Sequence, residues 1–152
     1  MFTEKINKRK LLTIIVSVYS VLQINSQSNK EIAYAYIKRA NDAIEKSIDY
    51  TTARINFENA MKYMGVITDE KVASLGARTY FEIHHKQRTV EKQIQFLEKS
   101  NTYSKQYFSL AKNKNSDDYA ENMEIYSLSK RYIKKLTYSN RRKKMRKFYL
   151  ER

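Results

Sequence analysis

The chain has 152 residues, a formal net charge of +14, no cysteine, no proline and two glycines. The absence of cysteine excludes disulfides, thiol catalysis and cysteine-ligated metal, and the scarcity of proline and glycine leaves few positions for tight turns. We therefore predict a single all-α domain.

The positive charge is concentrated at the C-terminus. Residues 130–152 contain eleven basic side chains and one acidic side chain, whereas residues 29–129 contain fifteen and fourteen. The middle of the chain therefore has a balanced surface, and the basic character belongs to the tail.

The first 28 residues have the three-part order of a secretory signal peptide. A polar, positive segment, residues 1–10, is followed by an apolar run, residues 11–22, and by a short polar segment, residues 23–28. The apolar run has twelve residues, whereas a membrane-spanning helix needs about 20. We therefore predict export, to a periplasm or outside the cell.

Cleavage is expected after Ser26 or Ser28. Ser28 and Glu31 would form a capping box for a helix that starts near Asn29, which favours Ser26 as the cleavage point. Two alternatives stay open, a buried first helix of a cytoplasmic protein and an uncleaved anchor. The segment Leu11–Leu22 is apolar on nearly all sides, which argues against a buried amphipathic helix.

Residues 34–65 are predicted to form two antiparallel helices that are separated by residues 47–49. Asp49 is expected to cap the second helix, because its carboxylate can accept hydrogen bonds from free backbone N–H groups. Gly65 is expected to adopt a left-handed conformation after that helix. Small and apolar residues recur at helical spacing on one face of each helix: Ala33, Tyr36, Ile37, Ala40, Ala43 and Ile44 in the first, and Tyr50, Ala53, Phe57, Ala60 and Met61 in the second.

This pattern resembles one tetratricopeptide repeat. The specific part is DYTTARINFENA, which has the family's Asp-Tyr turn followed by alanine, an aromatic residue and alanine. The matching positions are Ile37, Ala40, Asp49, Tyr50, Ala53, Phe57 and Ala60. The chain departs from the pattern at Ile37, where tryptophan is common, at Asn41, where glycine or alanine is usual, and at Gly65, where proline is common.

The resemblance covers residues 34–65 and implies a helix-pair scaffold that binds a peptide or protein partner, without naming that partner. Such repeats hold peptides on the surface of their first helices. The candidate partner-binding residues are therefore Lys38, Asn41, Asp42 and Glu45. The alternative is that these are ordinary solvated side chains.

A second helix pair follows. A third helix is predicted to begin at Thr68 and to end between His84 and Gln87, and a fourth to begin near Thr89. The position 34 residues after Phe57 is Glu91, so this pair is a degenerate repeat or a simple hairpin. Their expected inward residues are Val72, Leu75, Thr79, Tyr80 and Ile83, and then Val90, Ile94, Leu97, Tyr103, Tyr107 and Leu110.

Ser116 is expected to cap a fifth helix, which covers the last pair as helical arrays require. Its apolar stripe is Ile125, Leu128, Tyr132 and Leu136. The predicted fold is thus all-α, with antiparallel helical hairpins stacked as a short tetratricopeptide-like array and a closing C-terminal helix. The predicted organisation is a signal peptide (1–28), a helical repeat-like domain (29–137) and a basic tail (138–152).

No pattern typical of an enzyme is present in the sequence. His84 and His85 are adjacent, and adjacent helical residues point about 100° apart, so they cannot face one metal ion. Two glycines cannot build a phosphate-binding loop, and no glycine-framed nucleophile occurs. We expect no catalytic residue, no metal and no cofactor.

The tail contains the densest charge in the chain: Arg141, Arg142, Lys143, Lys144, Arg146 and Lys147. If the tail is helical, Met145, Phe148 and Tyr149 form a small apolar stripe. It could bind an anionic membrane surface, bind nucleic-acid phosphates, or be solvated without a specific partner. The predicted function is an exported, non-enzymatic interaction protein, and the alternative is a basic helical protein that binds nucleic acid through Lys130–Arg152.

Overall fold

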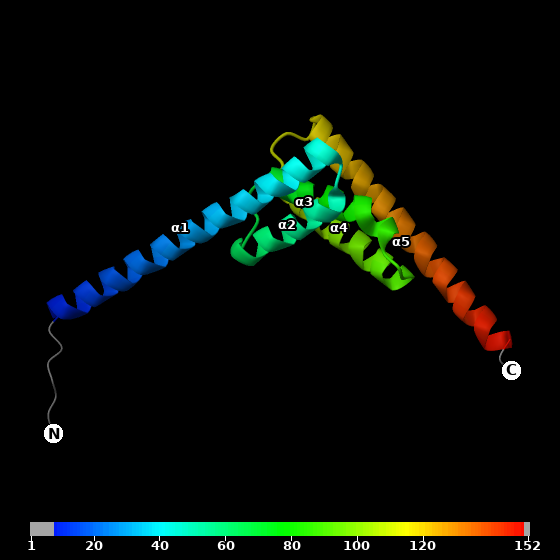
Figure 1. Cartoon of the computed structure of the whole chain (residues 1–152), viewed down its shortest axis with the longest axis horizontal. Coiled ribbons are helices and arrows are strands. Elements are labelled where there is room, and N and C mark those ends of the chain that lie inside the picture. Colours follow the sequence, from blue (N-terminus) through cyan, green and yellow to red (C-terminus); the bar gives the residue numbers. More distant parts are fainter. Residues whose placement is uncertain (1–7, 151–152) are drawn as a thin grey trace, which may run out of the picture.

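A computed structural model of the chain describes the backbone of residues 8–150 and the side chains of residues 28–150. Over residues 8–150 it contains five α-helices, one 3₁₀ turn and no strand. The elements are α1 (Lys8–Ser47), α2 (Tyr50–Tyr63), α3 (Glu70–Ile83), η1 (His84–Lys86), α4 (Val90–Leu110) and α5 (Asp117–Leu150). Each α-helix packs on the next along the chain (Figure 1). The predicted all-α array of hairpins with a closing C-terminal helix is confirmed.

Two residues, Ile48 and Asp49, connect α1 to α2. The Asp49 carboxylate accepts hydrogen bonds from the backbone N–H groups of Thr51, at 3.0 Å, and Thr52, at 3.1 Å, so the predicted cap is confirmed. The reversal itself takes place at Ile48, which has a left-handed φ of 52°. Its N–H donates to the carbonyl of Ile44 at 2.9 Å, the usual bond of a left-handed helix end.

The prediction for Gly65 is wrong, because no glycine of the described residues has a positive φ. Helix α2 ends at Tyr63, and Met64 continues in an extended conformation with φ −98° and ψ 102°. The chain then bends at Gly65 and Val66 on its way to α3, and neither residue adopts a left-handed conformation.

The start predicted for the first helix is also wrong. The structure has one helix from Lys8 to Ser47, and no proline or glycine interrupts this range. Ser28 therefore lies within α1 and does not cap a helix start in the full chain, and cleavage after Ser26 or Ser28 stays a prediction. The predicted signal peptide, residues 1–28, lies almost wholly outside the residues whose side chains are described, and it stays a prediction.

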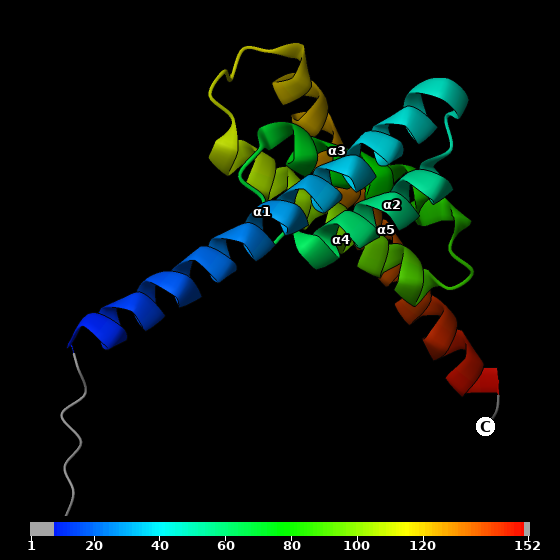
Figure 2. The same cartoon turned by 60° about the vertical axis from the view of Figure 1, so that its left-hand side comes forward.

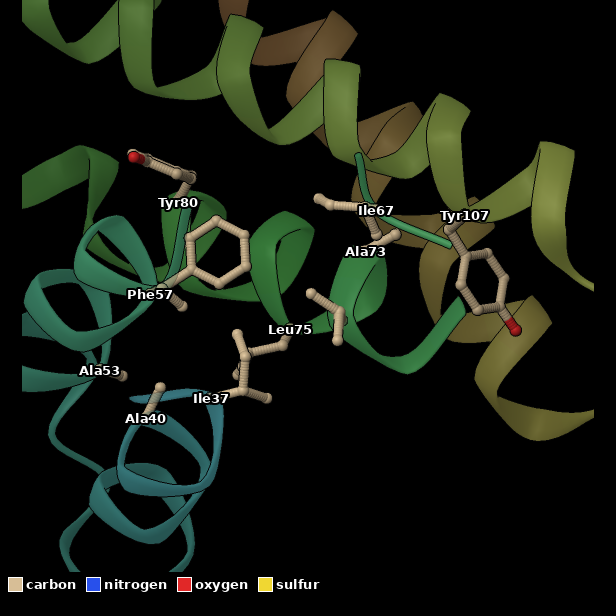
Figure 3. Close-up of a cluster of buried hydrophobic side chains, with 11 residues drawn as sticks. Ile37, Ala40, Ala53, Phe57, Ile67, Ala73, Leu75, Tyr80 and Tyr107 are labelled. Atoms are coloured by element: carbon tan, nitrogen blue, oxygen red, sulfur yellow. The ribbon is translucent and has the colours of Figure 1, made fainter. Parts of the chain in front are cut away.

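Helices α1 and α2 meet α3 through small residues and one large ring. Ala40, Ala53 and Ala60 are fully buried, which confirms the predicted alanine seam. The Phe57 ring is also fully buried and lies edge-on to the ring of Tyr103, with 5.1 Å between centroids. Figure 3 shows the Phe57 side chain directed from α2 toward α3, the helix that contains Leu75 and Tyr80. The ring thus joins the first helix pair to the second.

The second pair and α5 begin where the sequence indicates. Helix α3 begins at Glu70, two residues after the predicted Thr68, and Asp69 caps it. Helix α4 begins at Val90, directly after Thr89, as predicted, and Thr89 caps it. Ser116 caps α5, as predicted. The five inward residues predicted for α3 are all buried: Val72, Leu75, Thr79, Tyr80 and Ile83. Of the residues predicted for α4 and α5, three are buried and the rest are half-buried; the buried ones are Leu97, Tyr107 and Ile125.

The seam between α3, α4 and α5 contains small polar residues that the apolar pattern does not predict. Ser100 and Asn122 are fully buried in it. The Ser100 hydroxyl donates to the carbonyl of Ala77 at 2.9 Å, and the Asn122 amide donates to the Ser74 hydroxyl at 2.9 Å. Serine is small, and its hydroxyl can bond to a neighbouring backbone carbonyl, so the helices can approach closely without an apolar stripe on both sides.

Candidate functional site

The four predicted partner-binding residues lie together in the structure. Lys38, Asn41, Asp42 and Glu45 line one side of a hollow of about 410 Å³. The other side is formed by the start of α3, and the hollow's remaining lining residues are Tyr34, Ile37, Asp69, Lys71 and Val72. Asp42 is half-buried and the other three are exposed.

A second hollow, of about 420 Å³, shares Asn41, Glu45 and Lys71 with the first. It continues toward α4 and α5, and its other lining residues are Ile44, Glu70, Ser74, Leu75, Arg78, Tyr107 and Asp118. The two hollows therefore form one groove between α1 and α3, which we call the α1/α3 groove.

The α3 side of this groove is absent from the sequence prediction. Lys71, Ser74 and Arg78 have helical spacing next to the buried stripe of α3, which is the signal that would have indicated them. The sequence shows that stripe but does not show which of its two flanks faces α1.

Lys38, Asn41 and Glu45 follow one another at i, i+3 and i+7, so they lie on the same face of α1. Their side chains form no hydrogen bond or ion pair with any side chain or backbone group in residues 28–150. By contrast, the Asp42 carboxylate accepts a hydrogen bond from the Lys46 ammonium at 3.0 Å. Three of the four predicted residues thus have polar groups that are available to a partner.

The α3 side is held by the body of the protein. The Asp69 carboxylate accepts the backbone N–H of Lys71 at 2.9 Å, and the Glu70 carboxylate accepts the backbone N–H of Lys112 at 3.2 Å. Arg78 donates to the Glu121 carboxylate at 2.5 Å. Burial acts to lower the pKa of Arg78, but the hydrogen bond and the charge of Glu121 outweigh it, so the pKa is raised. This side is therefore fixed, and the residues of α1 are the adaptable ones.

The groove has the opposite charge balance from the rest of the chain. Its lining contains five acidic residues, Asp42, Glu45, Asp69, Glu70 and Asp118, and three basic residues, Lys38, Lys71 and Arg78. The whole chain has a net charge of +14. The groove therefore favours a neutral or moderately basic segment over an acidic one.

The histidine pair is part of an aromatic contact between the end of α3 and α5. The His84 ring stacks on the Tyr132 ring with 5.5 Å between centroids, and its Nδ1 contacts the carbonyl of Phe81. The His85 ring stands perpendicular to that of His84. Within the described part of the chain, no group of three or more metal-binding side chains occurs.

The basic residues of the tail, Arg141 to Lys147, do not line the α1/α3 groove. They lie on the last three turns of α5, which continues as helix to Leu150. All residues from 141 to 150 are exposed. The tail is therefore helical as far as Leu150.

Among the described residues, no helix has an apolar stretch long enough to cross a bilayer. No protein-family model matches the chain, and neither a curated protein nor a solved structure is significantly similar to it.

Proposed function

We propose that this chain is an exported, non-enzymatic interaction protein that binds a peptide or protein segment in the α1/α3 groove. The observation that carries the proposal is the position of Lys38, Asn41 and Glu45. They face one continuous groove and have no polar partner among the described residues. The tetratricopeptide-like pattern of residues 34–65 supports a groove that receives a peptide.

The chemistry of the groove suits an extended segment. The Asn41 amide can both donate and accept a hydrogen bond, so it can pair with the backbone of an extended chain. Lys38 and Glu45 lie seven residues apart, which is about 10 Å along a helix. That separation corresponds to about three residues of an extended peptide. A peptide segment with an acidic group opposite Lys38, a basic group opposite Glu45 and a backbone amide beside Asn41 would give all three side chains a polar partner.

Binding can be tested with a displayed library of random peptides that is selected on the full chain. The affinity of a selected peptide is then measured by fluorescence anisotropy. Lys38→Glu should weaken it at least tenfold, because the change removes a cation and places a carboxylate opposite the partner's acidic group. Lys92→Glu, at an exposed position on α4 outside the groove, is the matched control for the change in net charge. It should leave the affinity unchanged.

Deletion of residues 141–152 separates this proposal from nucleic-acid binding. Peptide affinity should survive the deletion, since none of residues 141–150 lines the α1/α3 groove. Loss of peptide binding on deletion, together with normal binding by Lys38→Glu, would contradict a role for the groove.

The export half of the proposal has its own test. The intact mass of the protein is measured in each fraction of cells that express the full gene. Export with cleavage should give a species that lacks the first 26 or 28 residues and lies outside the cytoplasm. A full-length species in the cytoplasm would contradict export and leave the groove proposal standing.

A further inference from the structure

Helix α5 leaves the body of the protein near Asn140. The Asn140 amide donates to the Glu91 carboxylate of α4 at 2.8 Å. Beyond it, residues 141–150 continue as helix and are all exposed. Figure 2 shows this end of α5 projecting past the other helices. The last turns of α5 are therefore a helical extension beyond the packed part of that helix.

Large apolar side chains lie on this projecting helix. Tyr138, Met145 and Tyr149 are at i, i+7 and i+11, so they share one side of the helix. Their exposed fractions are 68%, 57% and 74%. Phe148, three residues after Met145, widens this surface and is 53% exposed, and Leu150 at the end of the helix is 86% exposed. Exposed apolar residues that gather in this way mark an interaction surface more often than scattered ones.

The same helix has only one sign of charge. From Ile125 to Leu150 the chain contains ten basic residues and no acidic residue. Six of them lie between Arg141 and Lys147. At about 100° per residue, Arg141, Arg142 and Arg146 border the apolar stripe, and Lys143, Lys144 and Lys147 lie on the opposite side of the helix. A projecting helix with an apolar stripe and cationic flanks has the composition of a helix that lies in the plane of a membrane interface.

We propose that residues 138–150 bind the surface of an anionic lipid bilayer. Tyr138, Met145 and Tyr149 enter the boundary between headgroups and acyl chains, and the arginines that border them pair with lipid phosphates or carboxylates. The lysines on the other side of the helix add long-range attraction to the anionic surface. Tyrosine is suited to this position because its ring is apolar and its hydroxyl stays near water. The packed part of α5 then holds the helical domain, with its groove, at the membrane.

Charge complementarity favours an anionic bilayer over two other candidate partners of this surface, a second copy of the chain and nucleic acid. A second copy of the tail would bring two dense clusters of like charge together, which opposes pairing of the apolar stripes. Duplex nucleic acid would neutralise the basic residues, but it has no apolar surface to cover Met145 and Tyr149. An anionic bilayer provides both features at one interface.

The chain contains no tryptophan, so Tyr149→Trp in the full chain places a single reporter on the stripe. Ile55→Trp, at an exposed position on α2, is the matched control. With vesicles that contain phosphatidylglycerol, the indole emission of the Tyr149→Trp variant should shift to the blue and should be quenched by brominated acyl chains. The emission of the Ile55→Trp variant should do neither. The site-specific reporter separates the tail from any binding by residues 11–22, which all variants share.

The charge requirement is tested in the same background. Each basic residue near an anionic surface contributes about fivefold in affinity. Neutralising Arg141, Arg142, Lys143 and Lys144 to glutamine should therefore weaken vesicle binding by about a hundredfold or more. Circular dichroism checks that the variant keeps its helix content. Replacing Met145 and Tyr138 by serine should abolish bromine quenching while weaker salt-sensitive binding persists.

Three results would overturn the proposal. The first is no response of the Tyr149→Trp reporter to anionic vesicles. The second is an equal response with pure phosphatidylcholine, which would show that charge does not matter. The third is a response to a short DNA duplex that exceeds the response to anionic vesicles, which would assign the tail to nucleic acid.

Discussion

Gly76 gives the sharpest test of how the helix pairs fit together. A Cβ atom at this position would lie 2.6 Å from Cζ of Phe57 and 2.9 Å from Cγ of Tyr103. Ordinary contacts of a Cβ atom begin at 3.4 Å. Phe57 is fully buried and its ring is held edge-on to Tyr103, so neither ring can move aside cheaply. The rings of Phe57 and Tyr103 therefore occupy the space in which a side chain at position 76 would lie.

Gly76→Ala should lower the free energy of unfolding by about 1–2 kcal/mol. Helix propensity alone would raise it by about 1 kcal/mol, because glycine is a poor helix former. Overpacking of a filled core costs about 1–3 kcal/mol, and the two short approaches at this site place the cost at the upper end of that range. The steric cost of the added methyl group should therefore exceed the gain in helix propensity, and the variant should be less stable than the parent protein.

Urea denaturation followed by circular dichroism at 222 nm measures the change. Gly65→Ala is the matched control, since Gly65 has no atom within 4 Å of an added Cβ and no positive φ. It should be neutral or stabilising by up to about 1 kcal/mol. In a double-mutant cycle, Phe57→Leu should recover about 1 kcal/mol of the Gly76→Ala loss. A Gly76→Ala variant as stable as the parent would refute the close approach of α2, α3 and α4.

Three further perturbations test the first helix pair. Phe57→Ala should lower the free energy of unfolding by about 3–5 kcal/mol, as for other buried rings, and a loss below about 1 kcal/mol in urea denaturation would contradict the predicted pair. Ile48→Gly should raise it by about 0.5–1 kcal/mol, because glycine relieves the left-handed strain of a β-branched residue at some cost in chain entropy; an unchanged or lower urea midpoint would argue against the left-handed turn. Asp49→Ala should lower the midpoint at neutral pH. Hydrogen bonds from the side chain and backbone of Thr52 lower the pKa of Asp49 from its ordinary value of 3.8. Its stabilising effect is therefore complete above that value and is lost as the pH falls through the lower pKa of the folded protein. Parent and variant should converge in acid, and a difference that persists at pH 2 would contradict the cap.

Local features of the fold could be predicted because they depend on residues within one or two helical turns. The caps at Asp49, Thr89 and Ser116 each require a short polar side chain directly before a helix, and the sequence shows that arrangement. Apolar stripes at helical spacing likewise indicate which face is buried. The same local logic failed at Gly65, because a glycine after a helix permits a left-handed turn without requiring one.

The candidate site was predictable only in part. The resemblance of residues 34–65 to a helix-pair repeat pointed to Lys38, Asn41, Asp42 and Glu45, and these do lie on one surface. The opposite side, with Lys71 and Arg78, depends on which flank of α3 meets α1. That choice follows from the rotation of one helix about its axis, and no short-range pattern specifies it.

The sequence by itself determined the helical class, most of the helix boundaries, the alanine seam and the uneven charge. Only the tertiary structure decided that Gly76 receives the rings of Phe57 and Tyr103, that Ile48 makes the reversal, and that α5 continues beyond the body as a helix. Caps and stripes are fixed by neighbours in the chain. The groove and the ring packing join residues 25 to 77 positions apart, from Glu45 and Glu70 to Asn41 and Asp118. Their geometry exists only once the helices have packed.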